Sequence, residues 1–289
     1  MASRQQIKRR ITSVKNTKQI TKAMQLVAAS KLRKAQEAAV GPQEYSRVAR
    51  EMLTSLRQVA AAEPTFQLFK QRPVKRRLLV AITSDRTLAG AYNVNVIRQL
   101  IAELKKDREA GIETEVITIG RQAANAASRI QGLVVAGVYT GFPENPTAND
   151  IRPILTTAVS RFQAGEIDDV TLIYTHFKST ISQVVELRQL LPAGFEEETV
   201  STDIAHATVE PSVAVLLEST AMRLLEVQIY QALLEATASE HSMRMLAMKN
   251  ATDNASDLID DYTLEYNNAR QAAITQELAE ISGGAEAMK

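Results

Sequence analysis

The sequence contains no cysteine and no tryptophan among its 289 residues. Without cysteine, the chain cannot form a disulfide, use a thiolate nucleophile or hold zinc through sulfur. Aromatic residues make up only 4% of the chain, which suits helical rods better than a broad packed core, although 45% of the residues are hydrophobic. No apolar run approaches the roughly 18 residues of a membrane-spanning helix, and no secretory signal peptide is visible. We therefore expect a protein of the cytosol or of an organelle.

Glycine and proline are absent from residues 212–282, a stretch of 71 residues. Pro211 precedes this stretch and Gly283-Gly284 follows it, as at the start and end of a helix. The residues between them are mostly good helix formers such as Ala, Leu, Met, Glu and Gln. One continuous helix of this length would extend about 105 Å. A rod of that length must pair with another helix or enter a partner.

Residues 2–40 also lack glycine and proline. Their apolar positions form two triples with 4,3 spacing, separated by a slip of one residue: Ile7, Ile11, Val14 and Ile20, Met24, Val27. This spacing predicts a helical seam of the coiled-coil type. We expect Ser3 to cap the helix, Gly41-Pro42 to interrupt or kink it, and the helix to resume to about Gln58.

Charge is distributed unevenly, although the formal net charge is only +1. Residues 1–34 carry ten basic side chains and no acidic one, whereas residues 253–289 carry eight acidic and two basic side chains. The basic arm could bind nucleic acid or anionic lipid, or could act as a transit peptide. It could also form half of a coiled coil, with basic sites for an acidic partner. The seam spacing and the acidic C-terminal stretch favour the coiled coil.

The middle of the chain alternates short apolar runs with helical patterns, which indicates a parallel sheet. The last two strands are joined by a short connection, so we expect a hairpin that adds an antiparallel edge. An irregular acidic loop should follow at 192–210. The expected strands are 78–83, 115–119, 133–139, 170–177 and 181–190, and the expected helices are 92–110, 121–130 and 154–163.

The predicted fold class is mixed, α+β: a long antiparallel coiled coil of N- and C-terminal helices with an inserted α/β domain of the Rossmann-like type. The expected domains are 1–62, 75–195 and 211–283. Beyond about Glu265 the C-terminal helix should project alone. Its apolar positions there would have no partner within the chain and would need an external sleeve: Ala269, Ala273, Ile274, Leu278 and Ile281.

Motifs that would carry chemistry are weak. The chain has neither the phosphate-binding G-x-x-x-x-G-K-[ST] pattern nor G-x-G-x-x-G, and His176, His206 and His241 lack metal-ligand spacing. Ser84-Asp85-Arg86 stands where α/β enzymes place catalytic groups, but no base or nucleophile is visible beside it, so a capping turn is favoured. Four carboxylates share a helical face without a calcium-loop pattern, so a solvated face is favoured for Asp253, Asp257, Asp260 and Asp261. We expect no catalytic, metal or cofactor site.

Three helical segments and one turn resemble the gamma subunit of F-type ATP synthase. The helical segments are Ile20-Thr21-Lys22-Ala23-Met24 with Val27-Ala28-Ala29-Ser30-Lys31, residues 247–255 (AMKNATDNA) and residues 266–277 (YNNARQAAITQE). The turn is Thr83-Ser84-Asp85-Arg86 followed by Leu88-Ala89-Gly90. Thr87 stands where glycine is usual in that family, and Ala89 where many members have cysteine. The paired-cysteine insert of chloroplast members is absent.

The resemblance implies a rotor shaft without catalysis or cofactor, working with alpha and beta subunits, an epsilon subunit and the membrane ring of c subunits, and not with nucleic acid. Met1 followed directly by the family's first helix favours a peripheral membrane protein on the cytoplasmic side of a bacterial inner membrane. Residues 201–210 would contribute to the foot on the ring. By motif position, the contacts with an acidic loop of beta would be Met24, Arg244, Gln271, Thr275 and Glu277, with Lys22 and Arg270 as basic candidates alongside.

Two rival functions belong to other classes. An enzyme built on the α/β domain would use Asp85 and Arg86 as catalytic residues. A cytosolic adaptor or nucleic-acid-binding protein would use the basic N-terminal arm. The first would show turnover as an isolated chain, and the second would show salt-sensitive affinity for DNA or RNA.

Overall fold

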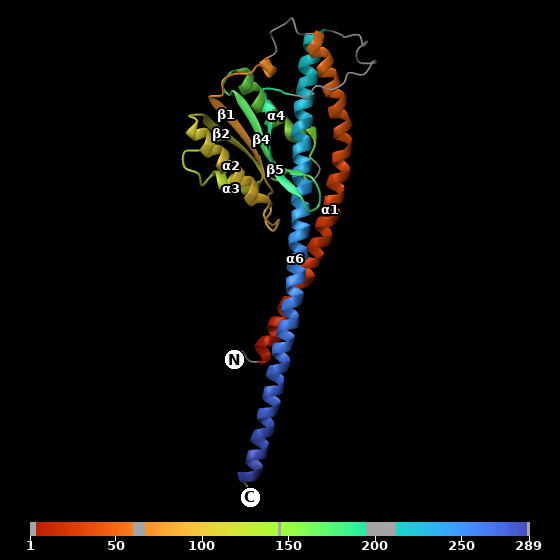
Figure 1. Ribbon diagram of the computed structural model, residues 1–289, viewed down its shortest axis with the longest axis vertical. Helices are drawn as coiled ribbons and strands as arrows, with labels where there is room; N and C mark the ends of the chain where they lie inside the picture. Colours follow the sequence, from red (N-terminus) through yellow and green to blue (C-terminus); the bar gives the residue numbers. More distant parts are fainter. Residues whose placement is uncertain (1–3, 60–66, 144–145, 195–211, 288–289) are drawn as a thin grey trace. The chain divides into compact units, whose positions relative to one another are not determined.

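A computed structural model describes residues 4–59, 67–143, 146–194 and 212–287. The chain begins with helix α1, Arg4–Val59, and ends with helix α6, Val213–Ala287 (Figure 1). It divides into two compact units. The terminal unit combines Met1–Ala28 with Arg244–Lys289, and the domain unit comprises Ala29–Met243.

Both long helices are more continuous than the sequence predicts. Helix α1 is not interrupted at Gly41-Pro42, so that part of the prediction was wrong. A helical proline costs about 3 kcal/mol, which the long flanking runs of good helix formers outweigh. Helix α6 passes through Gly283-Gly284 to Ala287, so the predicted stop was also wrong. A helical glycine costs only about 1 kcal/mol, which the preceding run of good helix formers outweighs. The predicted cap at Ser3 lies outside the described residues.

The domain unit contains a five-stranded sheet in the order β3-β2-β1-β4-β5. Strands β1, β2, β3 and β4 pair in parallel, and β5 pairs antiparallel with β4 at one edge. The predicted parallel sheet and antiparallel edge hairpin are therefore confirmed. The strands are β1 Arg76–Ile82, β2 Glu113–Ile119, β3 Val134–Tyr139, β4 Asp169–Phe177 and β5 Gln183–Leu191.

The short helices of the domain unit also match the predicted pattern, except at one start. Helix α4 begins at Ala148 and not at Ile154. Its first turn is held by a capping box, in which the Thr147 amide and hydroxyl both donate to the Asp150 carboxylate over 2.7 Å. These bonds, the backbone one first, lower the pKa of Asp150. The other helices are η1 Gln67–Phe69, α2 Tyr92–Glu109 and α3 Arg121–Ala127.

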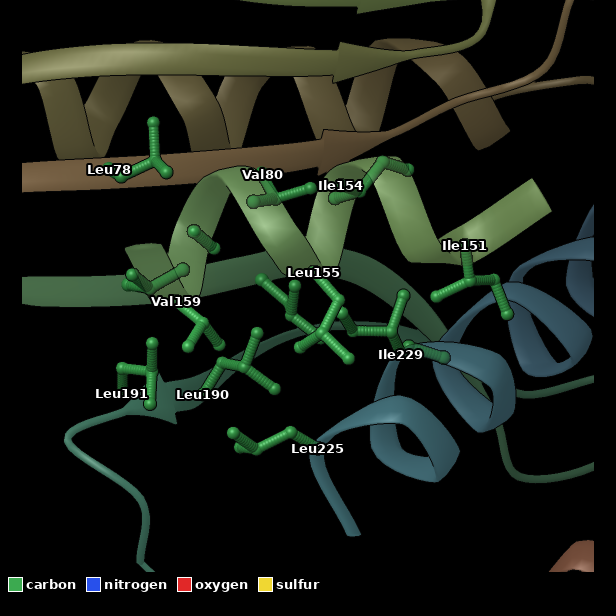
Figure 2. Close-up of a cluster of buried hydrophobic side chains, with 14 of the residues drawn as sticks. Leu78, Val80, Ile151, Ile154, Leu155, Val159, Leu190, Leu191, Leu225 and Ile229 are labelled. Atoms are coloured by element: carbon green, nitrogen blue, oxygen red, sulfur yellow. The ribbon is translucent and has the colours of Figure 1, made fainter. Parts of the chain in front are cut away.

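The sheet is covered on both faces, which explains why its central strands read as continuous apolar runs. On one face, α2 and α3 cover a small cluster around Leu79 and Val116. On the other face lies the main core, where α4 packs between the sheet and α6. Figure 2 shows Leu155 of α4 close to Ile229 of α6, below Val80 of β1. Because α1 contributes to this same core, the domain unit holds parts of both long helices.

Candidate functional site

The terminal unit is the candidate site because two helices meet there without a sheet. On α1, burial follows an unbroken heptad pattern that continues the spacing of Ile7, Ile11 and Val14. Its positions are Ile7, Ile11, Val14, Lys18, Thr21, Gln25 and Ala28, each buried or half-buried. The prediction that Ile20, Met24 and Val27 continue the seam after a slip was therefore wrong for Ile20 and Val27, which are exposed, whereas Met24 is half-buried. Small and polar residues occupy the seam, and apolarity alone does not reveal them.

Helix α6 carries a matching seam with the same alternating spacing of three and four residues. Its positions are Met245, Met248, Thr252, Ala255, Ile259, Tyr262, Tyr266, Ala269 and Ala273. Met248, Thr252 and Ala255 are buried, and the rest are half-buried. Small residues such as alanine and threonine allow two helix backbones to approach closely.

Between the described residues of this unit, a hydroxyl pair and an arginine–tyrosine contact join the two helices. The hydroxyls of Thr21 and Thr252 lie 2.8 Å apart. Either hydroxyl can be the donor in this pair, and the other can then donate to a carbonyl of its own helix, Lys18 for Thr21 or Met248 for Thr252. Further along, the Arg10 guanidinium lies 5.9 Å from the centroid of the Tyr262 ring. Lower numbers on α1 thus pair with higher numbers on α6, so the two helices run antiparallel, as predicted.

The outward side of this two-helix segment carries large apolar residues. Ile20 is 61% exposed and Val27 is 54% exposed, and Leu26 beside them is also exposed. On α6, the exposed apolar residues are Leu246, Leu258, Leu264, Ile274, Leu278 and Ile281. Five positions near this end were predicted to lack a partner within the chain. Ile274, Leu278 and Ile281 are exposed, in agreement, whereas Ala269 and Ala273 are half-buried. Ile20 and Val27 are seven residues apart and so share one face of α1, and exposed apolar residues on a shared face can mark an interaction surface.

The predicted contact residues all lie in the terminal unit, but they are not equally accessible. Arg244 is only 9% exposed and has interactions within the chain. Met24 is half-buried. Because α6 is one continuous helix, Arg244 and Gln271 lie about 40 Å apart along it, so the fold does not bring them together. The exposed members of the set are Lys22, Arg270, Gln271, Thr275 and Glu277.

The turn after β1 forms a structural junction. The Asp85 carboxylate accepts hydrogen bonds from the Arg121 amide at 2.9 Å and the Gly141 amide at 2.8 Å. Asp85 therefore ties β1 to the start of α3 and to the loop after β3. Ser84 is bound in turn by Asn93 of α2. A carboxylate held by two amides is positioned as a cap, which favours the capping reading of this turn over the catalytic one.

The other polar candidates show no metal geometry in the described part of the chain. Asp253, Asp257, Asp260 and Asp261 are all exposed. Across the described ranges, no group of three or more His, Asp or Glu side chains could hold a metal ion. His176 contacts Glu235 over 2.6 Å and His241 is buried, whereas His206 and the predicted foot at 201–210 lie outside the described residues.

Hydrophobicity along the helices gives one further finding. Within residues 4–59, 67–143, 146–194 and 212–287, no helix is apolar enough over a sufficient length to span a bilayer.

Comparisons with known proteins cover the whole chain. The sequence model of a family described as ATP synthase matches residues 3–288. The ATP synthase gamma chain of Exiguobacterium sibiricum is 42% identical over 291 residues, which cover 100% of both chains. That of Chloroflexus aurantiacus is 41% identical over 290 residues, covering 100% of this chain and 99% of the relative.

Solved structures agree with the sequence relatives. The central stalk/c-ring structure of the mitochondrial ATP synthase of Tetrahymena thermophila contains a similar chain, with a TM-score of 0.63 and 26% identity over 80% of this chain and 99% of that chain. A chain of the Euglena gracilis mitochondrial ATP synthase (OSCP/F1/c-ring, rotational state 3) has a TM-score of 0.68 over 99% of this chain and 94% of that chain; at 18% identity it supports the fold alone. The full-length family match and the identity above 40% show that the chain belongs to the gamma-chain family of ATP synthase.

Proposed function

We propose that this chain is the central rotor shaft of an F-type ATP synthase. It couples proton-driven rotation of the membrane ring to ATP synthesis or hydrolysis in the head of alpha and beta subunits. One observation carries the proposal most directly: Ile20 and Val27 are large and exposed, while the neighbouring seam positions Thr21 and Ala28 are small and buried. The apolar surface of such a two-helix segment is available to pack against a surrounding partner.

The head of alpha and beta subunits is the partner proposed for the terminal unit. The basic, acid-free start of α1 suits an acidic loop of beta, with Lys22 and Met24 at the contact on this helix. On α6, Arg270 and Gln271 form a second contact, together with Thr275 and Glu277. Because exposed charge pairs contribute only about 0–1 kcal/mol each, they select the orientation of the shaft more than they hold it.

Arg244 needs a different role from the exposed residues. Its side chain is buried and interacts within the chain, so only a small part of its surface is accessible for contact with a beta subunit. Gln271 is exposed and lies about 40 Å further along the same helix. We therefore propose that beta subunits contact the shaft at two axial positions along α6. Torque requires that these contacts differ between rotational states, because equal contacts in all states shift no equilibrium.

The domain unit and the base of the two long helices are proposed to bind the epsilon subunit and the c-subunit ring. In this arrangement the chain is a non-catalytic subunit and a peripheral membrane protein on the cytoplasmic side of a bacterial inner membrane. The two hydrogen bonds that hold Asp85 as a cap support the absence of chemistry at the turn after β1.

Reconstitution tests the proposal with a matched pair of valines. Val27 on α1 and Val94 on α2 are both 54% exposed. Either change to serine should alter the stability of the isolated chain by less than about 0.5 kcal/mol, as for most surface substitutions. With purified alpha and beta subunits and no epsilon, we expect Val27→Ser to lower assembly and ATP hydrolysis, and Val94→Ser to match the parent.

The same assay separates the rivals. The parent chain alone should show no turnover, yet should restore ATP hydrolysis when mixed with alpha and beta. Failure of the parent to restore hydrolysis would contradict the rotor role. Equal activity of the Val27→Ser and Val94→Ser complexes would instead show that the outward face of α1 is not the contact surface.

A further inference from the structure

Within the domain unit, three side chains on one face of α6 contact the β4–β5 hairpin. The Glu235 carboxylate lies within hydrogen-bond distance of Nδ1 of His176, at 2.6 Å. One turn later, the buried Ser239 hydroxyl donates to the Thr175 carbonyl over 3.1 Å. Ser242 follows two turns after Glu235. Residues spaced i, i+4 and i+7 lie in a row on a helix, so these contacts form a line along α6.

Ser242 lies at the end of this line and holds the tip of the hairpin. Its hydroxyl donates to the Thr180 carbonyl over 2.8 Å and accepts from the Gln183 side-chain amide over 3.1 Å. The two N–H groups of the Gln183 amide are shared between this hydroxyl and the carbonyls of Ser179 and Thr180, both at 2.9 Å. The tip is therefore closed on itself and tied to the helix. We call the four contacts of Glu235, Ser239 and Ser242 with the hairpin the hairpin clamp.

Charges around the first contact are arranged in a small network. Glu186 of β5 lies 3.8 Å from His176 and accepts from Arg188 over 3.0 Å. The Arg188 guanidinium also lies 5.0 Å from the centroid of the buried Tyr174 ring. Burial first, and then the negative charge of Glu235, raises the pKa of the Tyr174 phenol, which therefore stays neutral. His176 thus stands between carboxylates of α6 and of β5.

The chemistry of the α6 contact changes along the helix. From Leu217 to Ala236, most of its buried side chains are apolar and belong to the main core. Apolar contact is non-directional, so it holds a helix against a sheet without fixing its axial position closely. Hydrogen bonds require donor and acceptor to align. The hairpin clamp adds such a directional restraint between the β4–β5 hairpin and α6.

We propose that the hairpin clamp is the positioning element that makes the α/β domain and α6 turn as one body. The inference rests on the proposed rotor function. Torque on the domain must reach α6 without slip, and the clamp resists both sliding and rolling of the helix on the sheet. The residues that carry this role are Glu235, Ser239 and Ser242, with His176 and Gln183 as their partners.

Three variants of the complete ATP synthase test the clamp. Ser242→Ala removes the hydroxyl that joins Thr180 to Gln183. His176→Leu removes the contact with Glu235, whereas His176→Asn keeps an amide donor near the Nδ1 position and should rescue it. Thr237→Val is the matched control, because it also removes a 2.8 Å hydroxyl-to-carbonyl bond, but one internal to α6.

Hydrogen exchange in the assembled complex measures attachment of the hairpin. Each lost hydrogen bond should raise the detached population about threefold to tenfold, and amide exchange in β5 should accelerate by the same factor. Ser242→Ala and His176→Leu should show this acceleration. His176→Asn and Thr237→Val should exchange within about twofold of the parent.

Coupling is then measured in vesicles as proton pumping per ATP hydrolysed. Hydrolysis should stay within about twofold of the parent, while pumping per ATP falls at least about threefold in a Ser242→Ala/His176→Leu double variant. Normal coupling in a double variant with accelerated exchange would overturn the inference, as would loss of coupling in Thr237→Val. A parent complex without coupled pumping would contradict the rotor function itself, which is a separate result.

Discussion

Replacing Gly120 with alanine should destabilise the chain by about 3–5 kcal/mol. Gly120 follows β2 with φ 91° and ψ 145°, a region of backbone conformation that is open essentially to glycine. Forcing alanine into such a conformation costs about 1–3 kcal/mol. An added Cβ would also lie 2.6 Å from the carbonyl carbon of Thr83, and closer still to its oxygen. Because these are backbone atoms, the end of β1 would have to move.

That movement would strain two hydrogen bonds of Thr83. Its amide donates to the Ile119 carbonyl and its hydroxyl accepts from the Ala123 amide, each over 2.8 Å. At about 1 kcal/mol for each bond, the loss adds to the backbone term. Gly111 provides the control, since it has φ +70° with nothing within 4 Å of an added Cβ. Gly111→Ala should therefore cost only about 1–2 kcal/mol.

Urea unfolding of the two isolated variants measures the difference. The midpoint for Gly120→Ala should fall well below that for Gly111→Ala, with the slope of the transition unchanged. Equal costs for the two substitutions would refute the reasoning, because both positions have positive φ and only Gly120 has a backbone atom in the way.

Three further predictions concern other contacts. Thr21→Val should lower the free energy of unfolding by about 1 kcal/mol. Adding Thr252→Val should cost less than a second independent loss, because removing both hydroxyls leaves neither unpaired. A double-mutant cycle by urea unfolding measures this, and strictly additive losses of stability would argue against the bond. Arg161 binds Glu115 over 2.7 and 2.9 Å and, chiefly through that hydrogen bonding, lowers the pKa of Glu115 from its ordinary 4.5. Glu115→Gln should therefore cost about 1–2 kcal/mol at pH 7, and this difference should shrink as the pH falls below 4.5; a gap that is constant down to acid pH would be the contrary result. Asp85→Ala should lower the thermal midpoint by loosening α3, and should change no turnover of the isolated chain, whereas substrate turnover abolished by this change would restore the enzyme reading.

The domain unit was the part most open to prediction from sequence. Its strands are buried on both faces, so they read as short apolar runs such as Leu78–Ile82, and the alternation with helices implied a parallel sheet. The start of α4 was missed because residues 141–153 are rich in turn formers, although Thr147 and Asp150 have the spacing of a capping box. Local composition there masked a specific hydrogen-bond pattern.

The candidate site was harder to predict, because the spacing of its apolar residues identifies an exposed face and not the buried seam. Ile20 and Val27 have the spacing of a seam yet face outward, while Thr21 and Ala28 are buried. A chain that works inside a partner can have two apolar faces, and hydrophobic spacing cannot tell the internal face from the external one. The unbroken heptad from Ile7 was the usable signal. The proposed contacts with beta depend on partner chains and stay predictions.

The heptad seam also gives the terminal unit a handedness. Helices that meet every three and a half residues wind around each other as a left-handed supercoil. A torque of one sense overwinds such a supercoil and presses the two helices together, and a torque of the opposite sense unwinds it. One sense presses Thr21 and Thr252 together, and the other draws them apart. A shaft of this construction resists twisting differently in its two directions of rotation, so synthesis and hydrolysis load the same seam unequally.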